Sequence, residues 1–554
     1  MKPRYTLNQK HLNAASLDSD LQKLNPVCLD ILAQHGFETS AQIRPFLFPP
    51  ISQSLSPLNC RDIEPALDVL EEAVRTQKEI VVYRDYDVDG ISAGAVALEA
   101  LGGLGAKAHH YANDRNIDGF GICKNGINKI MQRWPEAKVI LTVDNGISGH
   151  EAIEYANQRG LTVVVTDHHE PGETLPPAQA VIDLKRQDEI YPFREMCGTG
   201  VIFRVMLDLY RRMNRSITTV LSTLDLVALA TVADVVPLVG ENRAFVQQGL
   251  KSIESANRPF FKHMLRLFDV KVINAHYTLA FQIVPALNSL SRMGENTDFA
   301  VEALISKDDT WVELQCNAFV ELNKTRKEKT SLLLEEAQSQ IGENPDPVIV
   351  LYSDRFTEGI VGIIAGRLKE EYWRPALVFA RDAEGNLKGS GRSVDGFDLK
   401  SALDQCSDLL LGYGGHKKAV GLSLKPENLS EFHRRICALA SNVQLAQKEV
   451  ELSCLLDENT LTLDLVHDLR VLEPYGEGFA EPVFGLRARP DEVMFMGSEN
   501  QHVKLTCSQS GLSIIGWNQA DAIRSSKKIP VKFIGKPALN IWNNNISLQF
   551  IQES

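Results

Sequence analysis

Short runs of apolar, β-branched residues alternate with amphipathic stretches from Glu79 onward. The runs predict strands, and the stretches with apolar residues every three or four positions predict helices. A regular alternation of strand and helix is typical of a parallel α/β sheet. The predicted strands are Ile80–Tyr83, Ala106–Tyr111, Val139–Val143 and Leu161–Thr166, and the predicted helices are Ala93–Leu101, Gly126–Arg133 and His150–Arg159.

The pattern changes further along the chain. Asp308 and Asp309 precede a helical pattern from about Thr310 to Gln340, which predicts a long, aspartate-capped linking helix. A second α/β pattern follows Pro345, and short alternating strands from about Val450 predict a small β-barrel. We therefore expect an α/β protein with two parallel-sheet domains and a C-terminal barrel. The expected domains are a helical region at 1–70, an α/β domain at 71–308, the linking helix at 309–342, a second α/β domain at 343–445 and the barrel at 446–554.

The composition fits an ordinary globular protein. Hydrophobic residues make up 44% and charged residues 23% of the 554 positions. One hydrophobic core stops growing at about 250–300 residues, so this length predicts several domains. We see no signal-peptide core near the N-terminus and no run of about 18 apolar residues, which predicts a cytoplasmic protein. The nine cysteines are widely spaced, as reduced thiols are.

The net charge of −13 argues against a broadly basic, nucleic-acid-binding surface. A carboxylate metal site, however, adds negative charge that bound cations offset. Basic residues also gather locally, because Val503–Lys536 contains six Lys or Arg and one acid. The charge therefore does not exclude nucleic acid as a partner.

Acidic motifs follow three of the predicted strands. They are Asp85-Tyr86-Asp87-Val88-Asp89-Gly90, Asp144-Asn145-Gly146 and Asp167-His168-His169. The carboxyl ends of parallel strands meet in one crevice, so we expect these motifs to converge. In an extended segment alternate residues share a face, which would present the carboxylates of Asp85, Asp87 and Asp89 together. Asp234, in an apolar helix expected at Leu226–Val236, is a further candidate.

Such a set of oxygen ligands suits Mg²⁺ or Mn²⁺, and the added imidazoles favour Mn²⁺. Each motif alone has an ordinary interpretation. A D-x-D-x-D-G sequence is often a calcium loop or a solvated turn, and the other two motifs are often turns or loops. Three such motifs at successive strand ends indicate a metal site instead.

The motifs resemble those of a known family. The three acidic motifs and Ala233-Asp234 are similar to the four motifs of the DHH superfamily of phosphoesterases, in their usual order. Gly414-Gly415-His416 resembles the signature of the associated DHHA1 domain. Ser390-Gly391-Arg392-Ser393 with Gly396-Phe397-Asp398-Leu399 resembles the substrate-binding segment of the RecJ family within that superfamily. The resemblance runs from about residue 20 to the C-terminus, where the barrel would be an OB fold.

The resemblance implies hydrolysis of single-stranded DNA from its 5′ end to mononucleotides in recombination and repair, with two Mn²⁺ or Mg²⁺ ions to activate water and hold the phosphate. We expect Asp144 as a ligand that bridges the ions, and Asp85 as a supporting or additional ligand. Asp167 would orient the histidines, and His169 would be a ligand or a phosphate contact. The full set of expected metal ligands is Asp85, Asp87, Asp89, Asp144, His168 and Asp234.

Substrate contacts and partners also follow from the resemblance. The 5′ phosphate would be held by Arg115, Ser390 and Arg392, and the strand would pass Arg292 and His416, although these arginines can also form interdomain salt bridges. In the barrel, the candidates for stacking on bases or for core packing are Trp517, Phe533 and Trp542. The resemblance further implies a monomer that works with a single-strand-binding protein and a RecQ-type helicase.

The chain departs from the family pattern at three places. Tyr83-Arg84 stands where many relatives have His-Gly, and Ala286 and Thr357 replace a frequent Arg and a common His. One potential ligand and some substrate contacts of the family therefore have other residue types in this chain. Two other functions are compatible with parts of the sequence. One is a phosphodiesterase for short oligonucleotides or cyclic dinucleotides, or a pyrophosphatase, and the other is a catalytically silent DNA-binding scaffold.

Overall fold

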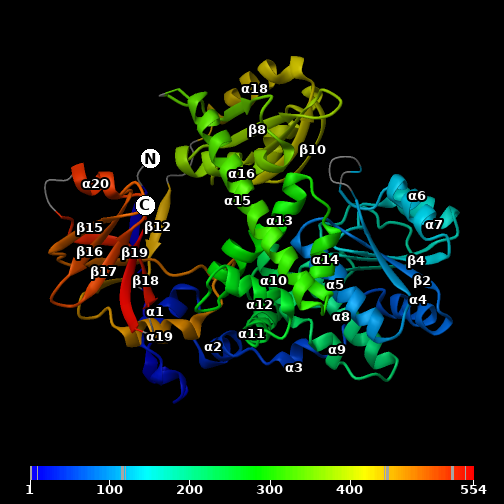
Figure 1. Ribbon diagram of the computed structural model, residues 1–554, viewed down its shortest axis with the longest axis horizontal. Coiled ribbons are helices and arrows are strands. Elements are labelled where there is room, and N and C mark those ends of the chain that lie inside the picture. The colour runs from blue at the N-terminus through cyan, green and yellow to red at the C-terminus, as the bar shows by residue number, and fades with distance from the viewer. Residues whose placement is uncertain are drawn as a thin grey trace. The chain divides into compact units, whose positions relative to one another are not determined.

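The computed structural model describes residues 3–553, apart from positions 9, 114–117, 119, 343, 442, 444–447, 526–528, 543 and 544, and describes only the backbone at 541, 542, 545 and 546. Two compact units are present along the chain shown in Figure 1. The smaller unit comprises residues 1–4, 286–296 and 317–449, and the larger one comprises 5–285, 297–316 and 450–554. Over the described residues, helices that are both long and apolar enough to cross a membrane are absent.

Five parallel strands form the first sheet of the larger unit, in the order β3-β2-β4-β5-β6. Their bounds are β2 Glu79–Arg84, β3 Ala108–Ala112, β4 Ala137–Val143, β5 Thr162–Asp167 and β6 Ala180–Asp183. The predicted parallel α/β architecture is confirmed for this domain. The chain runs from β2 outward to β3 and then crosses back to β4, so the strand order reverses between β2 and β4. Ligand sites in open parallel sheets lie at the carboxyl ends of strands at such a reversal.

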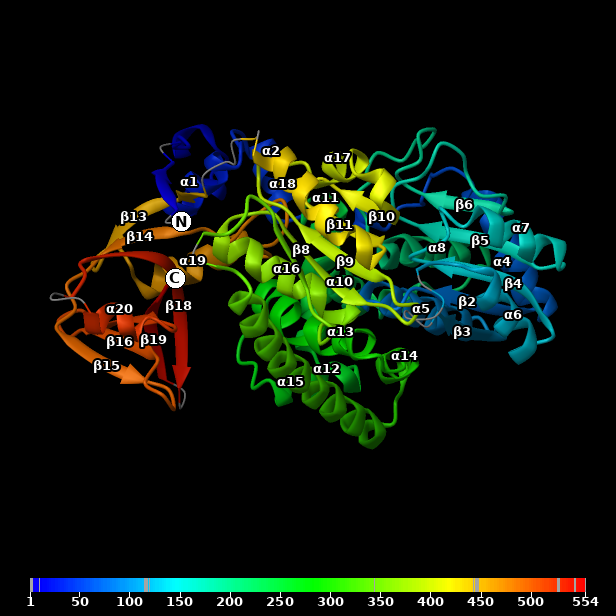
Figure 2. The ribbon, with the colours of Figure 1, turned by 90° about the horizontal axis from the view of Figure 1, so that it is seen from above.

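Helices cover both faces of this sheet (Figure 2). Val81, Ile140 and Val163 share one hydrophobic cluster with residues of α6 (Lys124–Arg133) and α7 (His150–Gln158). On the other face, α5 (Val88–Gly103) packs on β2 and α8 (Gly198–Arg212) packs on β5. Strands buried on both faces are apolar at nearly every position. This explains the uninterrupted apolar runs in the sequence.

Further helices complete this part of the larger unit. They are α4 (Ile63–Thr76), α10 (Leu224–Ala233), α11 (Gly240–Glu254), α12 (Pro259–Leu267), the π-helix η3 (Ala275–Ile283) and α14 (Asp298–Ile305). Helix α10 is apolar and buried, and its one acid, Asp225, accepts a hydrogen bond of 2.7 Å from Arg258. A buried carboxylate needs such a partner. Asp234 directly follows α10 as its C-cap residue, so it lies at the end of the helix and not within it as expected.

The predicted long helix is α15, Asp309–Ser339, which runs from the larger unit into the smaller one. Asp308 caps it, because the Trp311 amide donates to the Asp308 carboxylate at 3.1 Å. The smaller unit also contains α13 residues 286–293, α16 (Glu358–Tyr372), α17 (Leu399–Asp404) and α18 (Leu429–Ser441).

The sheet of the smaller unit is mixed, although the sequence pattern predicted a parallel one. Its order is β10-β11-β9-β8-β7, and only β7 with β8 is a parallel pair. The connections from β8 to β9 and from β10 to β11 are turns of a few residues, which can join only antiparallel neighbours. The strands are β7 Ile349–Tyr352, β8 Ala376–Arg381, β9 Leu387–Arg392, β10 Leu410–His416 and β11 Ala419–Leu424.

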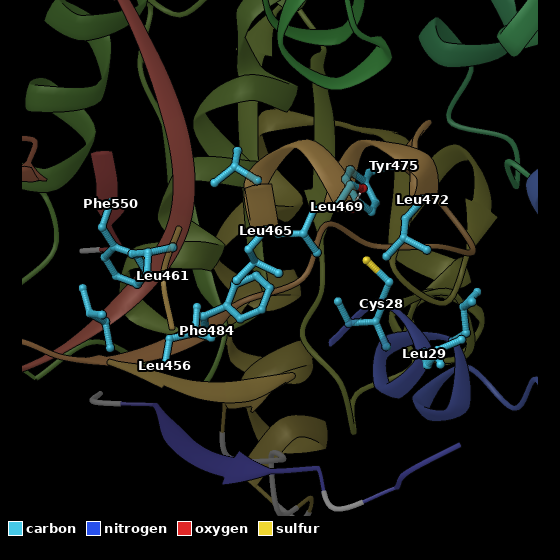
Figure 3. Packing of buried hydrophobic residues seen from close by; sticks show 14 of the residues in the cluster. Cys28, Leu29, Leu456, Leu461, Leu465, Leu469, Leu472, Tyr475, Phe484 and Phe550 are labelled. Atoms are coloured by element: carbon cyan, nitrogen blue, oxygen red, sulfur yellow. Dashed lines mark hydrogen bonds between the residues drawn. The ribbon is translucent and has the colours of Figure 1, made fainter. Parts of the chain in front are cut away.

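A seven-stranded sheet follows at the C-terminus, in the order β13-β14-β18-β19-β17-β16-β15. It is consistent with the expected OB fold. Cys28 and Leu29 of α1 (Pro26–Gln34) share a hydrophobic cluster with Phe484 and Phe550 of this domain and with α19 (Leu463–Leu469), as Figure 3 shows. The strands are β13 Cys454–Asp457, β14 Phe484–Arg487, β15 Glu492–Met496, β16 His502–Cys507, β17 Leu512–Gly516, β18 Lys532–Trp542 and β19 Asn545–Gln552.

Candidate metal centre

The first acidic motif forms the junction between β2 and α5. The expectation of an extended segment is wrong, because β2 ends at Arg84 and α5 begins at Val88, five residues before the helix predicted from Ala93. Asp87 is the N-cap of α5, and its carboxylate accepts from the Gly90 amide at 3.1 Å. A Cβ atom on Gly90 would lie 2.6 Å from the Asp85 carbonyl oxygen, so only glycine permits this tight turn.

The second motif follows β4, next to β2 in the sheet. Asp144 is buried and has a positive φ of 61°. The Asn145 amide group donates to the carbonyl oxygens of Tyr83 and Val143, both at 3.0 Å. These bonds connect the ends of β2 and β4. The Asp144 carboxylate is thereby placed at the reversal of the strand order.

The third motif follows β5 and is organised by Asp167. Its carboxylate accepts from the amides of Ile147 at 2.9 Å, His168 at 2.7 Å and His169 at 3.2 Å. It also lies 2.7 Å from Nδ1 of the His169 ring. Three backbone amides and the His169 ring thus hold this carboxylate, which is the geometry of a group that orients its neighbours.

His168 lies at the centre of the three motifs. Its Nε2 is 3.0 Å from a carboxylate oxygen of Asp144 and 3.6 Å from one of Asp89, and its Nδ1 is 3.6 Å from one of Asp234. Among the described residues, ligand atoms within 4.8 Å of one another form three groups. These groups are Asp144 with Asp167, His168 and His169; Asp89 with His168 and Asp234; and Asp85 with Asp87 and Asp144.

The electrostatics of this cluster favour bound cations. Burial, followed by repulsion from Asp89 and Asp87, raises the pKa of Asp234 to about 8. The same causes raise the pKa of Asp144 well above its ordinary value. Burial lowers the pKa of His168 to about 4, which leaves a neutral imidazole able to act as a ligand. Within the described residues, His168 Nδ1 is buried without a hydrogen-bond partner. Crowded carboxylates and a buried free ring nitrogen fit divalent metal ions.

Sequence reasoning missed the contribution of α8. The amides of Gly198 and Thr199, at the N-terminus of this helix, donate to the two carboxylate oxygens of Asp89 at 2.6 and 2.8 Å. A Cβ atom on Gly198 would lie 2.6 Å from Cβ of Asp144. The signal in the sequence was Gly198-Thr199-Gly200, a glycine-rich start to a helix, which is a common way to receive an anionic group.

Tyr83 and Arg84 have structural roles beside the cluster. The buried Arg84 guanidinium donates to the Asp85 carbonyl at 3.0 Å, to Thr297 at 3.0 Å and to Asp298 at 2.6 Å. The Tyr83 hydroxyl donates to Asn113 and accepts from the Cys123 amide at 3.3 Å. Arg84 thus fixes the backbone of the first motif, and Tyr83 ties together two positions that flank the segment of Arg115. Arg115 itself lies outside the described residues.

The remaining predicted substrate contacts belong to the smaller unit. Ser390 and Arg392 lie side by side on β9, where the guanidinium is 3.2 Å from the Ser390 hydroxyl. A Cβ atom on Gly362 of α16 would lie 3.1 Å from that hydroxyl, so this glycine leaves their side chains room. Gly359 lies directly on the backbone of Arg292, whose carbonyl oxygen would be 2.1 Å from an added Cβ. His416, at the end of β10, is exposed.

The departures at Ala286 and Thr357 have simple structural settings. Ala286 is fully buried in α13, and Thr357 is the N-cap residue of α16. In the C-terminal domain, Trp517 is 50% exposed, whereas Phe533 is buried in the core and cannot stack on a base. The Trp542 side chain and the basic residues Lys527 and Lys528 lie outside the described residues.

Comparisons with known proteins agree with this architecture. Residues 79–231 match the DHH family N-terminal domain, residues 346–442 match the DHHA1 domain, and residues 452–554 match the RecJ OB domain. The single-stranded-DNA-specific exonuclease RecJ of Escherichia coli is 33% identical over 520 residues, which cover 88% of this chain and 89% of that protein. The RecJ protein of Bacillus subtilis is 32% identical over 94% of this chain, which spans 66% of that longer relative.

Solved structures extend the likeness to the fold. The crystal structure of RecJ in complex with Mn²⁺ from Thermus thermophilus matches all of this chain and 79% of that one, with a TM-score of 0.83 at 29% identity. A crystal structure of exonuclease RecJ bound to manganese matches 71% of this chain and 97% of that one, with a TM-score of 0.61 at 31% identity. Sequence, domain order and fold therefore agree, and the chain belongs to the RecJ family of the DHH superfamily.

Proposed function

We propose that this protein is a metal-dependent exonuclease that hydrolyses single-stranded DNA from the 5′ end to 5′-mononucleotides, in DNA recombination and repair. The observation that carries the proposal is the convergence of Asp144, His168 and the neighbouring carboxylates at the carboxyl ends of β2, β4 and β5. The relatives named as single-stranded-DNA-specific exonucleases and the manganese-bound structures support it.

The proposed metal ligands are Asp85, Asp87, Asp89, Asp144, His168 and Asp234, for two Mn²⁺ or Mg²⁺ ions. Asp144 is a member of two of the three groups of ligand atoms, which supports its role as a bridging ligand. His168 faces Asp144 and Asp234 through different ring nitrogens. When bound, the cations activate a water molecule and stabilise the attacking and leaving oxygens.

The other residues of the cluster position the reacting groups. Asp167 holds the His169 ring through Nδ1, so that Nε2 is left to face the substrate. The His169 side chain is 41% exposed, more than those of Asp167 and His168, and we assign it to a contact with the scissile phosphate. The N-terminus of α8 keeps the Asp89 carboxylate in place through two backbone amides.

Exonuclease polarity requires a site for the chain end. We assign Ser390 and Arg392, together with Arg115, to the 5′ phosphate, and Arg292 and His416 to the strand that follows. The adjacent hydroxyl and guanidinium on β9 support this role, because charge-assisted hydrogen bonds of this kind suit a phosphate. Trp517 remains a candidate for stacking on a base of the strand.

The setting of the reaction is also part of the proposal. We expect a cytoplasmic monomer that acts with a single-strand-binding protein and a RecQ-type helicase. The domain boundaries proposed from the sequence are 1–70, 71–308, 309–342, 343–445 and 446–554. They group the metal ligands in the second of these segments and the β9 residues in the fourth.

A nuclease assay tests the proposal. Purified protein with Mn²⁺ or Mg²⁺ is incubated with 3′-labelled single-stranded and duplex oligodeoxynucleotides, with Asp144→Ala as the control. We expect shortening of the single strand from its 5′ end, which EDTA and the substitution abolish. Cleavage restricted to dinucleotides or pyrophosphate would favour a small-substrate enzyme, and binding without cleavage with either metal would favour a scaffold.

A further inference from the structure

A cavity of about 220 Å³ lies in the larger unit, apart from the metal ligands. The π-helix η3, helix α19 with the segment that follows it, and strand β18 surround this cavity. Part of its wall is apolar and is formed by Leu469, Tyr475 and Phe484, which belong to the hydrophobic cluster in Figure 3. Cavities for drug-sized ligands measure about 300–1,000 Å³, so this one suits a single small planar group.

Three aromatic rings gather beside the cavity on η3. Tyr277, which lines it, is 49% exposed, and Phe281 is 59% exposed. The ring of His276 lies between them, with its centroid 4.9 Å from that of Tyr277 and 4.8 Å from that of Phe281. π-Helical segments are rare and are frequently found at functional sites. The ring planes of His276 and Tyr277 are 89° apart and those of His276 and Phe281 are 62° apart, so a planar ligand can stack on one exposed ring at a time, such as that of Tyr277.

The polar side of the cavity carries two carboxylates and two cations. The Glu481 carboxylate is 2.9 Å from Nζ of Lys536 and 3.9 Å from Nε2 of His276. The Glu473 carboxylate is half-buried, and in the described part of the chain it accepts no hydrogen bond. Burial raises the pKa of Glu473 to about 7. Arg470 lines the same cavity and is exposed.

These groups match the parts of a nucleotide. An aromatic surface stacks on the face of a base, and a carboxylate accepts hydrogen bonds from the amino group of cytosine. The exposed Arg470 is suited to a phosphate oxygen. A basic peptide would also satisfy the two carboxylates, but the adjacent cations Lys536 and Arg470 would repel it. A segment of single-stranded DNA satisfies both sets of charges.

We propose that this cavity receives one base of the DNA strand, stacked on Tyr277, and that Glu473 makes the site prefer cytosine to thymine. The inference rests on the proposed function, because it takes single-stranded DNA as the substrate. It adds a contact to the strand that the metal centre and the β9 residues do not provide. Thymine carries an oxygen where cytosine carries its amino group, so the ionised form of Glu473, which predominates above about pH 7, repels it.

Binding in EDTA tests the inference without cleavage. We would measure the fluorescence anisotropy of 3′-labelled oligo(dC) and oligo(dT) with the full-length protein. Tyr277→Ala removes the ring on which the base stacks and should weaken oligo(dC) binding about 10-fold. Tyr277→Phe keeps the ring and should bind as the wild type does. Phe299→Ala removes another exposed aromatic ring, 46% exposed on α14, and is the matched control.

A second variant tests the base preference. Glu473→Gln places an amide donor where the carboxylate was, so the ratio of oligo(dC) to oligo(dT) affinity should fall several-fold. Thermal melting of each variant identifies those that fail to fold. If Tyr277→Ala fails to fold, Tyr277→Phe replaces it, and a photoreactive cytosine in the oligonucleotide should crosslink to residue 277. Unchanged affinities in folded Tyr277→Ala and Glu473→Gln would overturn the assignment and leave a protein partner as the occupant.

The outcome is separable from that of the proposed function. Cleavage of DNA by the wild-type protein with Mn²⁺ tests the function alone, because the binding measurements contain no metal. If the wild-type protein cleaves DNA but Tyr277→Ala binds DNA as tightly as the wild type, this inference is wrong and the exonuclease proposal stands. If DNA binding depends on Tyr277 but the protein does not cleave DNA, the exonuclease proposal is wrong and this inference stands.

Discussion

Replacement of Asp167 by Asn tests how the metal centre is oriented. The Asp167 carboxylate accepts three backbone amides and faces Nδ1 of His169. An asparagine has one accepting oxygen and one NH₂ group. If its oxygen takes the place of Oδ1, it keeps the bonds from His168 and His169, but its NH₂ group then faces the Ile147 amide, which is itself a donor.

The structure sets the expected magnitude. One hydrogen bond to a charged acceptor is lost, which costs about 1.5–3 kcal/mol, and the buried donor at Ile147 is left unsatisfied. The free energy of unfolding should therefore fall by at least about 2 kcal/mol. Outer-sphere partners of metal-binding histidines change metal affinity or activity about 10- to 100-fold when they are replaced. We expect a loss of that size for Mn²⁺ binding and for hydrolysis by Asp167→Asn.

The assay combines three measurements on the same protein. Urea unfolding gives the stability, calorimetric titration gives the Mn²⁺ affinity, and release of mononucleotides gives kcat. Asp208→Asn is the matched control, because the buried Asp208 also accepts a backbone amide, that of Leu58 at 2.7 Å, but lies outside the groups of ligand atoms. It should lose stability and keep Mn²⁺ affinity.

One result would refute this reasoning. If Asp167→Asn is less stable than the wild type but binds Mn²⁺ and hydrolyses DNA equally well, the orientation of His168 and His169 does not depend on Asp167. A parallel loss of Mn²⁺ affinity in Asp208→Asn would show that general destabilisation, and not orientation, weakens the metal centre.

Three further predictions concern the same site and the chain end. Gly198→Ala should lower Mn²⁺ affinity about 10- to 100-fold, because the added Cβ would lie 2.6 Å from Cβ of Asp144. Gly200→Ala should leave the affinity unchanged, because its added Cβ would come no closer than 3.4 Å to another atom, Cβ of Met196. Calorimetric titration with Mn²⁺ distinguishes the two variants. Without metal, the melting temperature should fall between pH 7 and 9. The pKa of Asp234 is raised to about 8 and that of His169 to about 9, so the folded protein binds more protons than the unfolded chain. Mn²⁺ or Asp234→Asn should reduce this dependence of the melting temperature on pH, and a melting temperature that rises with pH would contradict the prediction. Arg392→Gln should reduce the preference for 5′-phosphorylated over 5′-hydroxyl strands about 10-fold. Arg355→Gln, which replaces an exposed arginine of the same unit, should leave this preference unchanged. If competition assays give Arg392→Gln the same preference as the wild type, Arg392 does not bind the 5′ phosphate.

The sequence predicted the parts of the fold that depend on local pattern. The runs around Val81, Ile140 and Val163 identified buried strands, because both faces of this sheet are covered. The sheet of the smaller unit was harder to predict. Strands β7 and β8 are apolar like those of the first sheet, whereas β9 and β10 are rich in glycine. The short turns, such as the one between β10 and β11, show which strands pair antiparallel.

The candidate site was predictable where the ligand types are unusual. Three acidic motifs after successive strands could be recognised together, and the structure brings them together. Long-range contacts were harder to predict, because a local motif such as Gly198-Thr199-Gly200 does not identify its partner. Nothing near Asp89 in the sequence indicates that the amides of Gly198 and Thr199, more than a hundred positions away, will hold its carboxylate. The same is true of Arg84, whose partners Thr297 and Asp298 lie even further along the chain.

The two amides that hold Asp89 also affect the entropy cost of binding an ion. A carboxylate fixed at both oxygens has already lost its rotamer freedom during folding, so binding a cation costs little further side-chain entropy. Exchange of one divalent ion for another then requires no rearrangement of this ligand. We therefore expect Asp89 to adopt the same rotamer with Mg²⁺ as with Mn²⁺, and differences between the two metals to arise from ligands that are held less firmly, such as Asp234 at the end of α10.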